Sequence, residues 1–506
     1  EFMENIMEQL SRKLLPSIHT AGLEIGPREE YPVKVMQFGE GNFLRAFIDW
    51  MIDKSNEAGK FGGMVQLVQP LPQGTADLIN EQDGLYTLIL RGMENGKAAE
   101  YKRIITCVKG CLKTDSEWQK VVECACLPSL EVVFSNTTEA GIEYKPEAYE
   151  PGKTPVTYPA KLTSLLFERF KSGAKGLLFV PCELIDKNGA KLRECILKYA
   201  ADWKLGEAFE SYVKNDCAFL NTLVDRIVAG YPRAEAAAYC EKLGYQDNLL
   251  DCGEIFHLFV IEGDEKYRKV LPFAEAGLHV VWTANQTPYR SRKVRFLNGG
   301  HTSSVLGAYL AGFDFVDQMT GDALFGKYLR TALFEEVFPT VQLPDDEKKA
   351  FAESIIDRFL NPFANHQLIS ISLNSISKWQ VRVLPSLLDY QKESGRLPKV
   401  LTFSLAALLA FYRGSRDAEG NWSGKRAKGA YPIKDDDAKI AFINECYAEL
   451  DKTGDYDAFA KAVLGRADFW GMDLNTVPGL AAATAANLRK IQTAGIVKAV
   501  EELLEA

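Results

Sequence analysis

The stretch YPVKVMQF at residues 31–38, followed by GEGNFLR at residues 39–45, decides the fold. The apolar run ends at Gly39, and apolar side chains return after Gly41 at the spacing of a helix. Two glycines between a strand and a helix let the backbone bend sharply and approach a phosphate at the helix N-terminus. The third glycine of the usual motif is absent. The stretch therefore predicts a dinucleotide-binding turn, and a plain tight turn stays an alternative.

Strand-like and helical segments alternate beyond this turn. Apolar runs that end in turn residues occur at 64–68, 85–92, 103–110, 130–137 and from 176, with helical spacing at 115–125 and 159–171. This alternation predicts an α/β protein in which a Rossmann-like doubly wound domain occupies residues 1–289. From about residue 290 the spacing is almost wholly helical, which predicts a mostly α-helical C-terminal domain over residues 290–506. The polar residues 414–437 are predicted to form a long surface loop.

Size and charge exclude several classes of protein. At 506 residues the chain can build at least two hydrophobic cores, and 47% hydrophobic with 25% charged residues excludes a disordered or fibrous protein. The net charge of −9 argues against a nucleic-acid partner, because phosphate binding requires a basic face. A small anionic ligand remains compatible with this charge. We therefore expect a small-molecule partner, and no protein partner can be inferred.

The cysteines and the apolar segments indicate a cytoplasmic protein. Ten cysteines are scattered without CxxC spacing, and no regular pattern of metal ligands is present, which favours reduced thiols and a site without a metal. The first residues lack the apolar core of a signal peptide. The most apolar run, residues 400–412, is too short to cross a bilayer and is predicted to be a buried helix.

The end of the second predicted strand leaves the choice of cofactor open. A dinucleotide site usually has an acidic residue there to bind the ribose, but this strand ends in Gln69, and no arginine for a 2′-phosphate is near. Gln69 would serve as a neutral hydrogen-bonding substitute. Loops at the carboxyl edge of such sheets also contact the cofactor. The predicted cofactor-binding residues are Gly39, Gly41, Asn42, Phe43, Arg45, Gln69, Ser135, Asn136 and Thr137.

A lysine, an asparagine and a histidine recur within TPYRSRKVRFLNGGHTSSV at residues 287–305. On one helix, Lys293, Asn298 and His301 would lie within an arc of about 140°. A neutral Lys293 could take a proton from an alcohol, and the arginines at 290, 292 and 295 could lower its pKa. Asn298 could then stabilise the developing alkoxide, and His301 could orient the substrate. A helix cap at Asn298 and a solvated arginine face are the structural alternatives.

These segments resemble a known family. KVRFLNGGH resembles the lysine, asparagine and histidine signature of the mannitol dehydrogenase family, the long-chain polyol-specific dehydrogenases. GEGNFLRAF resembles the glycine motif of the family, and DGLYTL at 83–88 and LVDRI at 223–227 resemble further segments. The resemblance runs from about residue 34 to 385. It implies a dehydrogenase that uses NAD and takes Lys293, Asn298 and His301 as catalytic residues, with Lys293 as acid and base and no metal.

Within the family, several segments are similar to members that act on sugar acids. These segments are SNTTEAGI, PAKLTSLLFERF, PCELIDKNG, GEIFHLFVIEG and SLNSISKWQVRVLPSL. Where polyol enzymes carry a substrate-binding asparagine after a cysteine-acid pair, this chain has Leu184, and Asn188 is the nearest replacement. Where they carry a substrate-binding arginine, this chain has Ser370. The substrate pocket is therefore expected to differ from a polyol pocket.

A sugar acid adds one carboxylate, for which an arginine or a lysine-histidine pair is the expected ligand. Lys378, Arg382 and His366 are the candidates for this contact, and Asp225 is the candidate for a substrate hydroxyl. An amphipathic helix with a basic outer face would explain Arg382 equally, and a surface ion pair with Arg226 would explain Asp225. A polyol dehydrogenase, a dinucleotide-binding regulator and a metal-dependent enzyme with ligands from distant segments also stay open.

Overall fold

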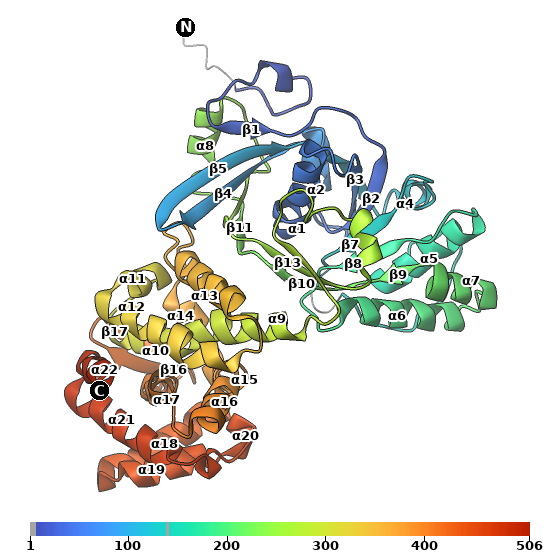
Figure 1. Cartoon of the computed structure of the whole chain (residues 1–506). Coiled ribbons are helices and arrows are strands. Elements are labelled where there is room, and N and C mark those ends of the chain that lie inside the picture. Colours follow the sequence, from blue (N-terminus) through green and yellow to red (C-terminus); the bar gives the residue numbers. More distant parts are fainter. Residues whose placement is uncertain (1–6, 138–140) are drawn as a thin grey trace. The chain divides into compact units, whose positions relative to one another are not determined.

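The structure is a computed structural model that describes residues 7–137 and 141–506 (Figure 1). The chain forms two compact units. The first, called the sheet unit here, comprises residues up to Arg91 together with Ala99–Gln286. The second, the helical unit, comprises Gly92–Ala98 and Thr287–Ala506. Each unit has its own core, and the two are described separately.

A six-stranded parallel sheet forms the centre of the sheet unit. Its strand order is β6-β3-β2-β7-β8-β9, and each neighbouring pair is parallel. This is the order of a doubly wound dinucleotide-binding fold, with β2 at the point where the order reverses. The predicted fold class is confirmed. The strands are β2 (Val33–Phe38), β3 (Met64–Gln69), β6 (Val108–Lys113), β7 (Val132–Ser135), β8 (Leu178–Pro181) and β9 (Ala218–Phe219).

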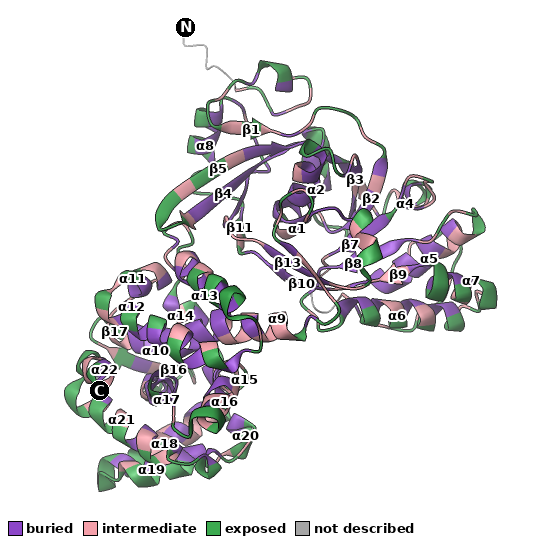
Figure 2. Ribbon diagram, in the orientation of Figure 1, coloured by how far each residue is buried: buried purple, intermediate pink, exposed green. Residues whose placement is uncertain are grey.

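Both faces of this sheet are apolar because helices cover both. Val35 packs into the core beneath the first two helices, whereas Met36 and Phe38 pack into the core on the other face. Figure 2 shows the strands as predominantly buried. The helices of the unit are α1 (Asn42–Ala46), α2 (Ile48–Glu57), α3 (Ala76–Glu81), α4 (Trp118–Ala125), α5 (Tyr158–Lys171), α6 (Asn188–Asp202), α7 (Glu207–Ser211) and α8 (Ala236–Leu243).

The apolar run at residues 103–110 is divided between two sheets. Its first part ends β5 and its second part begins β6, with Thr106 and Cys107 between them. A five-stranded sheet contains β1 (Leu23–Ile25), β5 (Lys97–Ile105), β4 (Tyr86–Glu94), β12 (Asp251–Gly253) and β11 (Val228–Gly230), in that order. A three-stranded sheet contains β10 (Asn221–Asp225), β13 (Leu258–Glu262) and β14 (Val280–Thr283).

The helical unit is built around α17 (Lys399–Phe411), whose residues are buried from Val400 onward except Ala410. The predicted buried helix is therefore present. Among the residues that the structure describes, no helix is long and apolar enough to cross a membrane. The other helices are α9 (Thr287–Arg292), α10 (Gly299–Leu310), α11 (Val316–Gly321), α12 (Ala323–Arg330), α13 (Asp345–Phe359), α14 (Leu368–Ile371), α15 (Ser375–Arg382), α16 (Leu384–Ser394), α18 (Asp437–Thr453), α19 (Tyr456–Leu464), α20 (Ala467–Trp470), α21 (Leu480–Ala494) and α22 (Ile496–Glu505).

The prediction of a long loop at residues 414–437 is wrong. A three-stranded antiparallel sheet occupies most of it, formed by β15 (Gly414–Arg416), β16 (Trp422–Arg426) and β17 (Gly429–Pro432). Gly420 lies between β15 and β16, and Gly429 is the first residue of β17, each with positive φ. Only Gly424 and Tyr431 of the strand residues are buried, so the stretch lacks the apolar alternation by which strands are recognised.

Candidate active site

Gly39 forms the bend between β2 and α1. Its φ of +122° is one that side chains rarely adopt, and a Cβ there would lie 3.1 Å from the carbonyl oxygen of Asn136. Gly39 N donates to Val68 O at 3.1 Å, and Asn136 N donates to Phe38 O at 3.1 Å. These bonds join the ends of β2, β3 and β7. The glycine turn and the predicted segment 135–137 therefore lie together at the carboxyl edge of the sheet.

Gly41 precedes α1 and leaves open space in front of it. No atom lies within 4 Å of the place that a Cβ of Gly41 would take, and no side chain caps the helix. Phe43 follows on α1 and stacks on Phe47 with ring centroids 5.1 Å apart. A helix start without a side chain in front of it admits a phosphate. The turn formed by Gly39 and Gly41 therefore fits the diphosphate of a dinucleotide.

Arg45 holds this turn from inside the sheet unit. Its guanidinium is buried and donates to Glu40 O at 3.1 Å, to Leu249 O at 3.0 Å and to Asn42 Oδ1 at 2.8 Å. The hydroxyl of Tyr86 donates to Arg45 O at 2.6 Å. These contacts fix the first turn of α1 and the direction of the Asn42 side chain. Arg45 thus supports the glycine turn through its protein contacts.

The amide of Gln69 is used by the loop that follows β3. Its Oε1 accepts from Ala76 N at 3.1 Å, and its Nε2 donates to Leu71 O at 2.8 Å. Glu40 accepts a hydrogen bond from Thr75 N at 3.4 Å, and burial raises the pKa of this carboxyl. Both side chains therefore shape the loop at residues 70–75. The hydrogen-bonding groups of Gln69 are already engaged there.

Glu183 holds the segment that follows β7. Its Oε2 accepts from Ser135 Oγ at 3.1 Å, and its Oε1 accepts from the backbone N and the Oγ1 of Thr137, both at 3.0 Å. Burial raises the pKa of Glu183, while these hydrogen bonds lower it. Sequence reasoning did not select Glu183 as a site residue. Its place two residues after β8, at the carboxyl edge of the sheet, was the available signal.

Asn188 begins α6 and is fully buried. Its Nδ2 donates to Pro181 O at 3.0 Å and to Glu183 O at 3.1 Å, and its Oδ1 accepts from Thr222 N at 2.9 Å. The amide thus links the end of β8 to β10, and both of its ends are engaged inside the sheet unit. Asp225 is the last residue of β10 and is buried.

Lys293, Asn298 and His301 lie on one continuous helix of the helical unit. A π-helical turn at Lys293–Asn298 connects α9 to α10. In a π-helix each hydrogen bond joins residues five apart, which brings Lys293 and Asn298 closer to alignment than an α-helix would. His301 follows Asn298 by three residues, a spacing that shares a face. The three side chains therefore leave the helix on one side.

The three arginines near Lys293 have different surroundings. Arg295 donates to Asp389 Oδ2 at 2.6 Å and to Thr340 O at 2.9 Å, so an acid compensates its charge. Arg292 is buried, and its guanidinium lies 4.2 Å from the ring centroid of Phe351. Lys293 itself is half-buried. Of the three arginines that were expected to lower the pKa of Lys293, Arg295 is thus already paired with an acid.

His301 is buried between aromatic rings. It stacks on Phe359 with ring centroids 4.1 Å apart and an interplanar angle of 3°. The ring of His366 is nearly perpendicular to that of His301, with ring centroids 5.1 Å apart. Burial holds the pKa of His301 well below its ordinary value, and the nearby charges of His366, Arg382, Arg358 and Lys378 lower it further. His301 is therefore neutral at neutral pH. The structure thus places His366 and the basic residues of α15 beside His301.

α15 carries Lys378 and ends at Arg382. Lys378 Nζ donates to Ile371 O at 2.8 Å. Burial lowers the pKa of both side chains, and for Lys378 the charge of Arg382 adds to this effect. Ser370 is exposed, and its hydroxyl donates to Gln367 O at 2.7 Å. Polyol enzymes are expected to carry an arginine at this position. This chain has a serine instead, whose short side chain bonds to the backbone three residues earlier.

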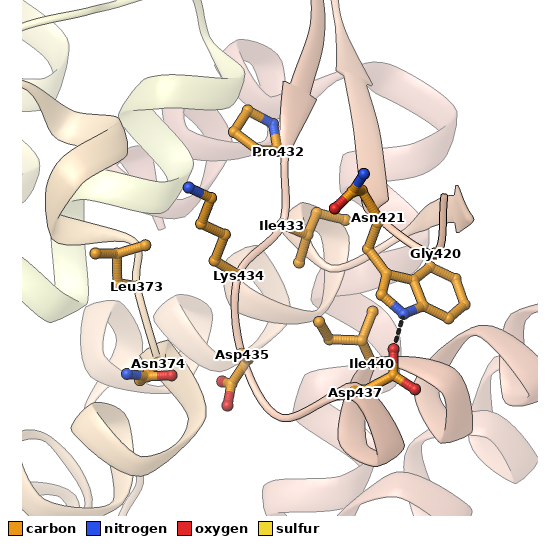
Figure 3. Close-up of a pocket in the computed structure, with 11 residues that line it drawn as sticks. Leu373, Asn374, Gly420, Asn421, Pro432, Ile433, Lys434, Asp435, Asp437 and Ile440 are labelled. Atoms are coloured by element: carbon orange, nitrogen blue, oxygen red, sulfur yellow. Dashed lines mark hydrogen bonds between the residues drawn. The ribbon is translucent and has the colours of Figure 1, made fainter. Parts of the chain in front are cut away.

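A surface cavity of about 500 Å³ lies at the start of α15 (Figure 3). Its lining includes Trp422, whose indole N donates to Asp437 at 2.9 Å, and Asn374 and Asp435, which belong to two different segments. Asp435 also accepts from Ile376 N at 3.3 Å, so one wall of the cavity anchors the first turn of α15. None of the predicted site residues lines this cavity. Among the described residues, no three His, Cys, Asp or Glu side chains gather as metal ligands.

Two family models match consecutive parts of the sequence. The Mannitol dehydrogenase Rossmann domain matches residues 33–272, and the Mannitol dehydrogenase C-terminal domain matches residues 285–492. The chain belongs to the mannitol dehydrogenase family. The resemblance of the KVRFLNGGH segment is therefore confirmed at the level of the family. The two matched regions correspond closely to the sheet unit and the helical unit.

Curated relatives match almost the whole chain. An altronate oxidoreductase of Pectobacterium atrosepticum is 43% identical over 481 residues, covering 94% of this chain and 98% of the relative. An altronate oxidoreductase of Halalkalibacterium halodurans is 39% identical over 505 residues, covering 98% of each. These relatives confirm the similarity to sugar-acid members. The chain is a dehydrogenase that acts on CH–OH groups.

Two solved structures share the fold. A D-sorbitol dehydrogenase in substrate-free form has a TM-score of 0.80 at 22% identity, with 97% of this chain and 100% of the other covered. The Pseudomonas fluorescens mannitol 2-dehydrogenase, in a ternary complex with NAD and D-mannitol, has a TM-score of 0.67 at 21% identity, with 98% and 99% covered. At this identity the similarity establishes the architecture of both units.

Proposed function

We propose that the protein is a tagaturonate reductase (altronate oxidoreductase) that interconverts D-tagaturonate and D-altronate in galacturonate catabolism, with NAD as cofactor and without a metal. The observation that carries the chemistry is the helix on which Lys293, Asn298 and His301 share one side. The relatives named altronate oxidoreductase, which match nearly the full chain, support the choice of substrate.

The residues of this helix divide the reaction between them. When bound, the nicotinamide supplies the hydride that adds to the ketone carbon. The Lys293 ammonium gives its proton to the ketone oxygen, so that ketone, hydride and proton together make the alcohol. The amide of Asn298 donates to the same oxygen while negative charge builds on it. In the oxidation of altronate, neutral Lys293 takes the hydroxyl proton.

His301 acts as a neutral hydrogen-bonding group in this proposal. Burial and neighbouring charges keep its pKa low, so it does not compete with Lys293 as a proton donor at neutral pH. In the sheet unit we assign the binding of a substrate hydroxyl to Asp225. Asn188 acts indirectly, because its amide already links β8 to β10.

The sheet unit supplies the features that favour a dinucleotide. Gly39 and Gly41 admit the diphosphate, and the backbone of Asn42 begins the helix behind it. The loop at residues 70–75, which Gln69 shapes, is the proposed ribose contact. This loop contains no arginine for a 2′-phosphate, which favours NAD over NADP. The segment at residues 135–137 completes the proposed cofactor site.

The substitution Lys293→Ala tests the proposed chemistry. Because the variant lacks the proton donor, kcat for tagaturonate reduction should fall by about 10²-fold or more. The assay follows NADH oxidation with tagaturonate, fructuronate and fructose side by side, and NADPH replaces NADH in one series. Lys327→Ala, an exposed lysine on α12, is the matched control and should retain activity.

Each alternative predicts a different result. An unchanged rate in Lys293→Ala excludes the acid-base role of this lysine. A preference of about tenfold or more for fructose over tagaturonate excludes the proposed substrate, and a comparable preference for fructuronate assigns the other uronate epimer. Loss of activity on addition of a chelator would indicate a metal. If the wild-type protein turns over none of these ketones, a dinucleotide-binding regulator becomes the better interpretation.

A further inference from the structure

Basic residues lie around His301 in the helical unit, and the inference drawn from them rests on the proposed function. Gly299 packs against the end of α15, because a Cβ there would lie 2.9 Å from Arg382 O. Gly300 packs against Phe359, whose ring would lie 3.5 Å from its Cβ. These two glycines let the end of α15 and the end of α13 approach the helix that carries Lys293. The cluster thus adjoins the catalytic helix.

The Nε2 atom of His301 is the first sign of a ligand. It is buried and has no hydrogen-bond partner within the described part of the chain. A buried polar atom without a partner costs free energy unless a ligand or water satisfies it. The flat stacking on Phe359 and the edge contact with His366 hold the imidazole in one orientation. His301 is therefore a fixed group that still has hydrogen-bonding capacity.

Arg382 is the second sign. Its guanidinium is half-buried, and within residues 7–137 and 141–506 the side chain makes neither a hydrogen bond nor an ion pair. Burial alone accounts for the lowering of its pKa, so no carboxylate of the described residues offsets its charge. A half-buried charge without a counterion is unfavourable in the free protein and favours an external anion.

Lys378 differs from Arg382 in its surroundings. Its ammonium already donates to Ile371 O at 2.8 Å, and the charge of Asp435 raises its pKa against the effect of burial. Part of its charge is therefore compensated inside the helical unit. Of the two basic side chains on α15, Arg382 is the one that uses none of its donors within the described residues. A guanidinium also presents two parallel N–H groups, which match the two oxygens of a carboxylate.

We propose that Arg382, together with His301 and His366, forms the subsite that binds the carboxylate of the sugar acid, and that Arg382 is the main determinant of uronate specificity. Lys378 has the smaller role of positioning the substrate chain. The carboxylate of tagaturonate is at the opposite end of the carbon chain from the ketone. This subsite therefore sets the direction in which the substrate presents its ketone to Lys293.

The test compares two ketones that differ only at the proposed contact. D-Tagatose carries a CH₂OH group where D-tagaturonate carries the carboxylate. In Arg382→Gln, kcat/KM for tagaturonate should fall by roughly 100-fold, mostly through KM, while kcat/KM for tagatose stays within roughly threefold of wild type. Arg382→Lys should restore part of the loss. Arg330→Gln, an exposed arginine on α12, is the matched control.

The outcomes separate this inference from the proposed function. Equal losses with both ketones, or no loss with tagaturonate, would overturn the role of Arg382. Retained tagatose turnover shows that Arg382→Gln is folded. If the wild-type enzyme reduces fructuronate and not tagaturonate, the proposed substrate is wrong, and the same comparison of fructuronate with fructose decides the role of Arg382. If it reduces only neutral ketoses, both proposals are wrong.

Discussion

Glu183 controls the segment that follows β7 through a single carboxylate. Its two oxygens accept hydrogen bonds from Ser135 and from two donors of Thr137. In Glu183→Gln an NH₂ group replaces one acceptor and faces a donor, so the segment loses at least one hydrogen bond. We expect NADH to bind roughly tenfold more weakly, because a lost hydrogen bond to a charged group changes binding by about that factor.

Fluorescence titration with NADH measures this effect directly. The matched control is Glu168→Gln on α5, where the carboxylate pairs with Lys171 at the surface. That variant should bind NADH as wild type does, because exposed ion pairs contribute little. Equal NADH affinity in Glu183→Gln and wild type would show that the position of residues 135–137 does not depend on this carboxylate.

Individual side-chain roles were only partly predictable from the sequence. The sequence identified Gln69 and Asn188 as ligand-binding candidates by their places in a motif, but tertiary contacts engage both amides inside the sheet unit. No sequence pattern shows which hydrogen bonds a buried amide will make. Phe359, by contrast, belongs to no motif that the sequence analysis identified. It lies beside His301 because α13 packs against α10.

In the glycine turn between β2 and α1, we expect Gly39 to be needed for stability and Gly41 for cofactor binding. Gly39→Ala places a side chain at φ +122° and 3.1 Å from Asn136 O, so it should lower the free energy of unfolding by about 1–3 kcal/mol. Gly41 has φ −70°, and a Cβ there would meet no atom within 4 Å. The free energy of unfolding of Gly41→Ala should therefore stay within about 0.5 kcal/mol of wild type.

NADH binding should respond differently in these two variants. The added methyl group of Gly41→Ala occupies the space proposed for the diphosphate, so NADH affinity should fall by roughly tenfold or more without a loss of stability. Urea denaturation and NADH titration on both proteins test the pair. Unchanged NADH affinity in Gly41→Ala would place the diphosphate elsewhere, whatever the stability of Gly39→Ala.

At the level of elements, periodicity predicted what is strongly patterned. The apolar run at residues 31–38 became β2 at the centre of the sheet, and the apolar run at residues 400–412 became the buried α17. The sheet at residues 414–432 was missed because its strands are short and contain few buried residues. The π-helical turn at Lys293–Asn298 was also missed, since its local sequence has ordinary helical spacing.

At the level of the whole molecule, the net charge of −9 conceals a local positive region. Lys378 and Arg382 lie beside the neutral His301 in the helical unit, although acidic residues outnumber basic ones along the chain. A small anion responds to the field near its site, and a long polyanion responds to the surface as a whole. The overall charge thus argues against a nucleic-acid partner and is still compatible with a carboxylate subsite.

The acid stability of the whole chain should depend on His257, which faces Trp50 and accepts from His279 N. Burial and then the charge of Arg226 lower its pKa to about 3. Below about pH 6.5 the unfolded chain takes up a proton there and the folded chain does not, so stability falls as pH falls, by about 1.4 kcal/mol per pH unit. Relative to His257→Gln, which cannot titrate, wild type should therefore lose about 2 kcal/mol between about pH 7.5 and pH 5 in urea denaturation. Parallel stability curves for the two proteins would contradict this assignment.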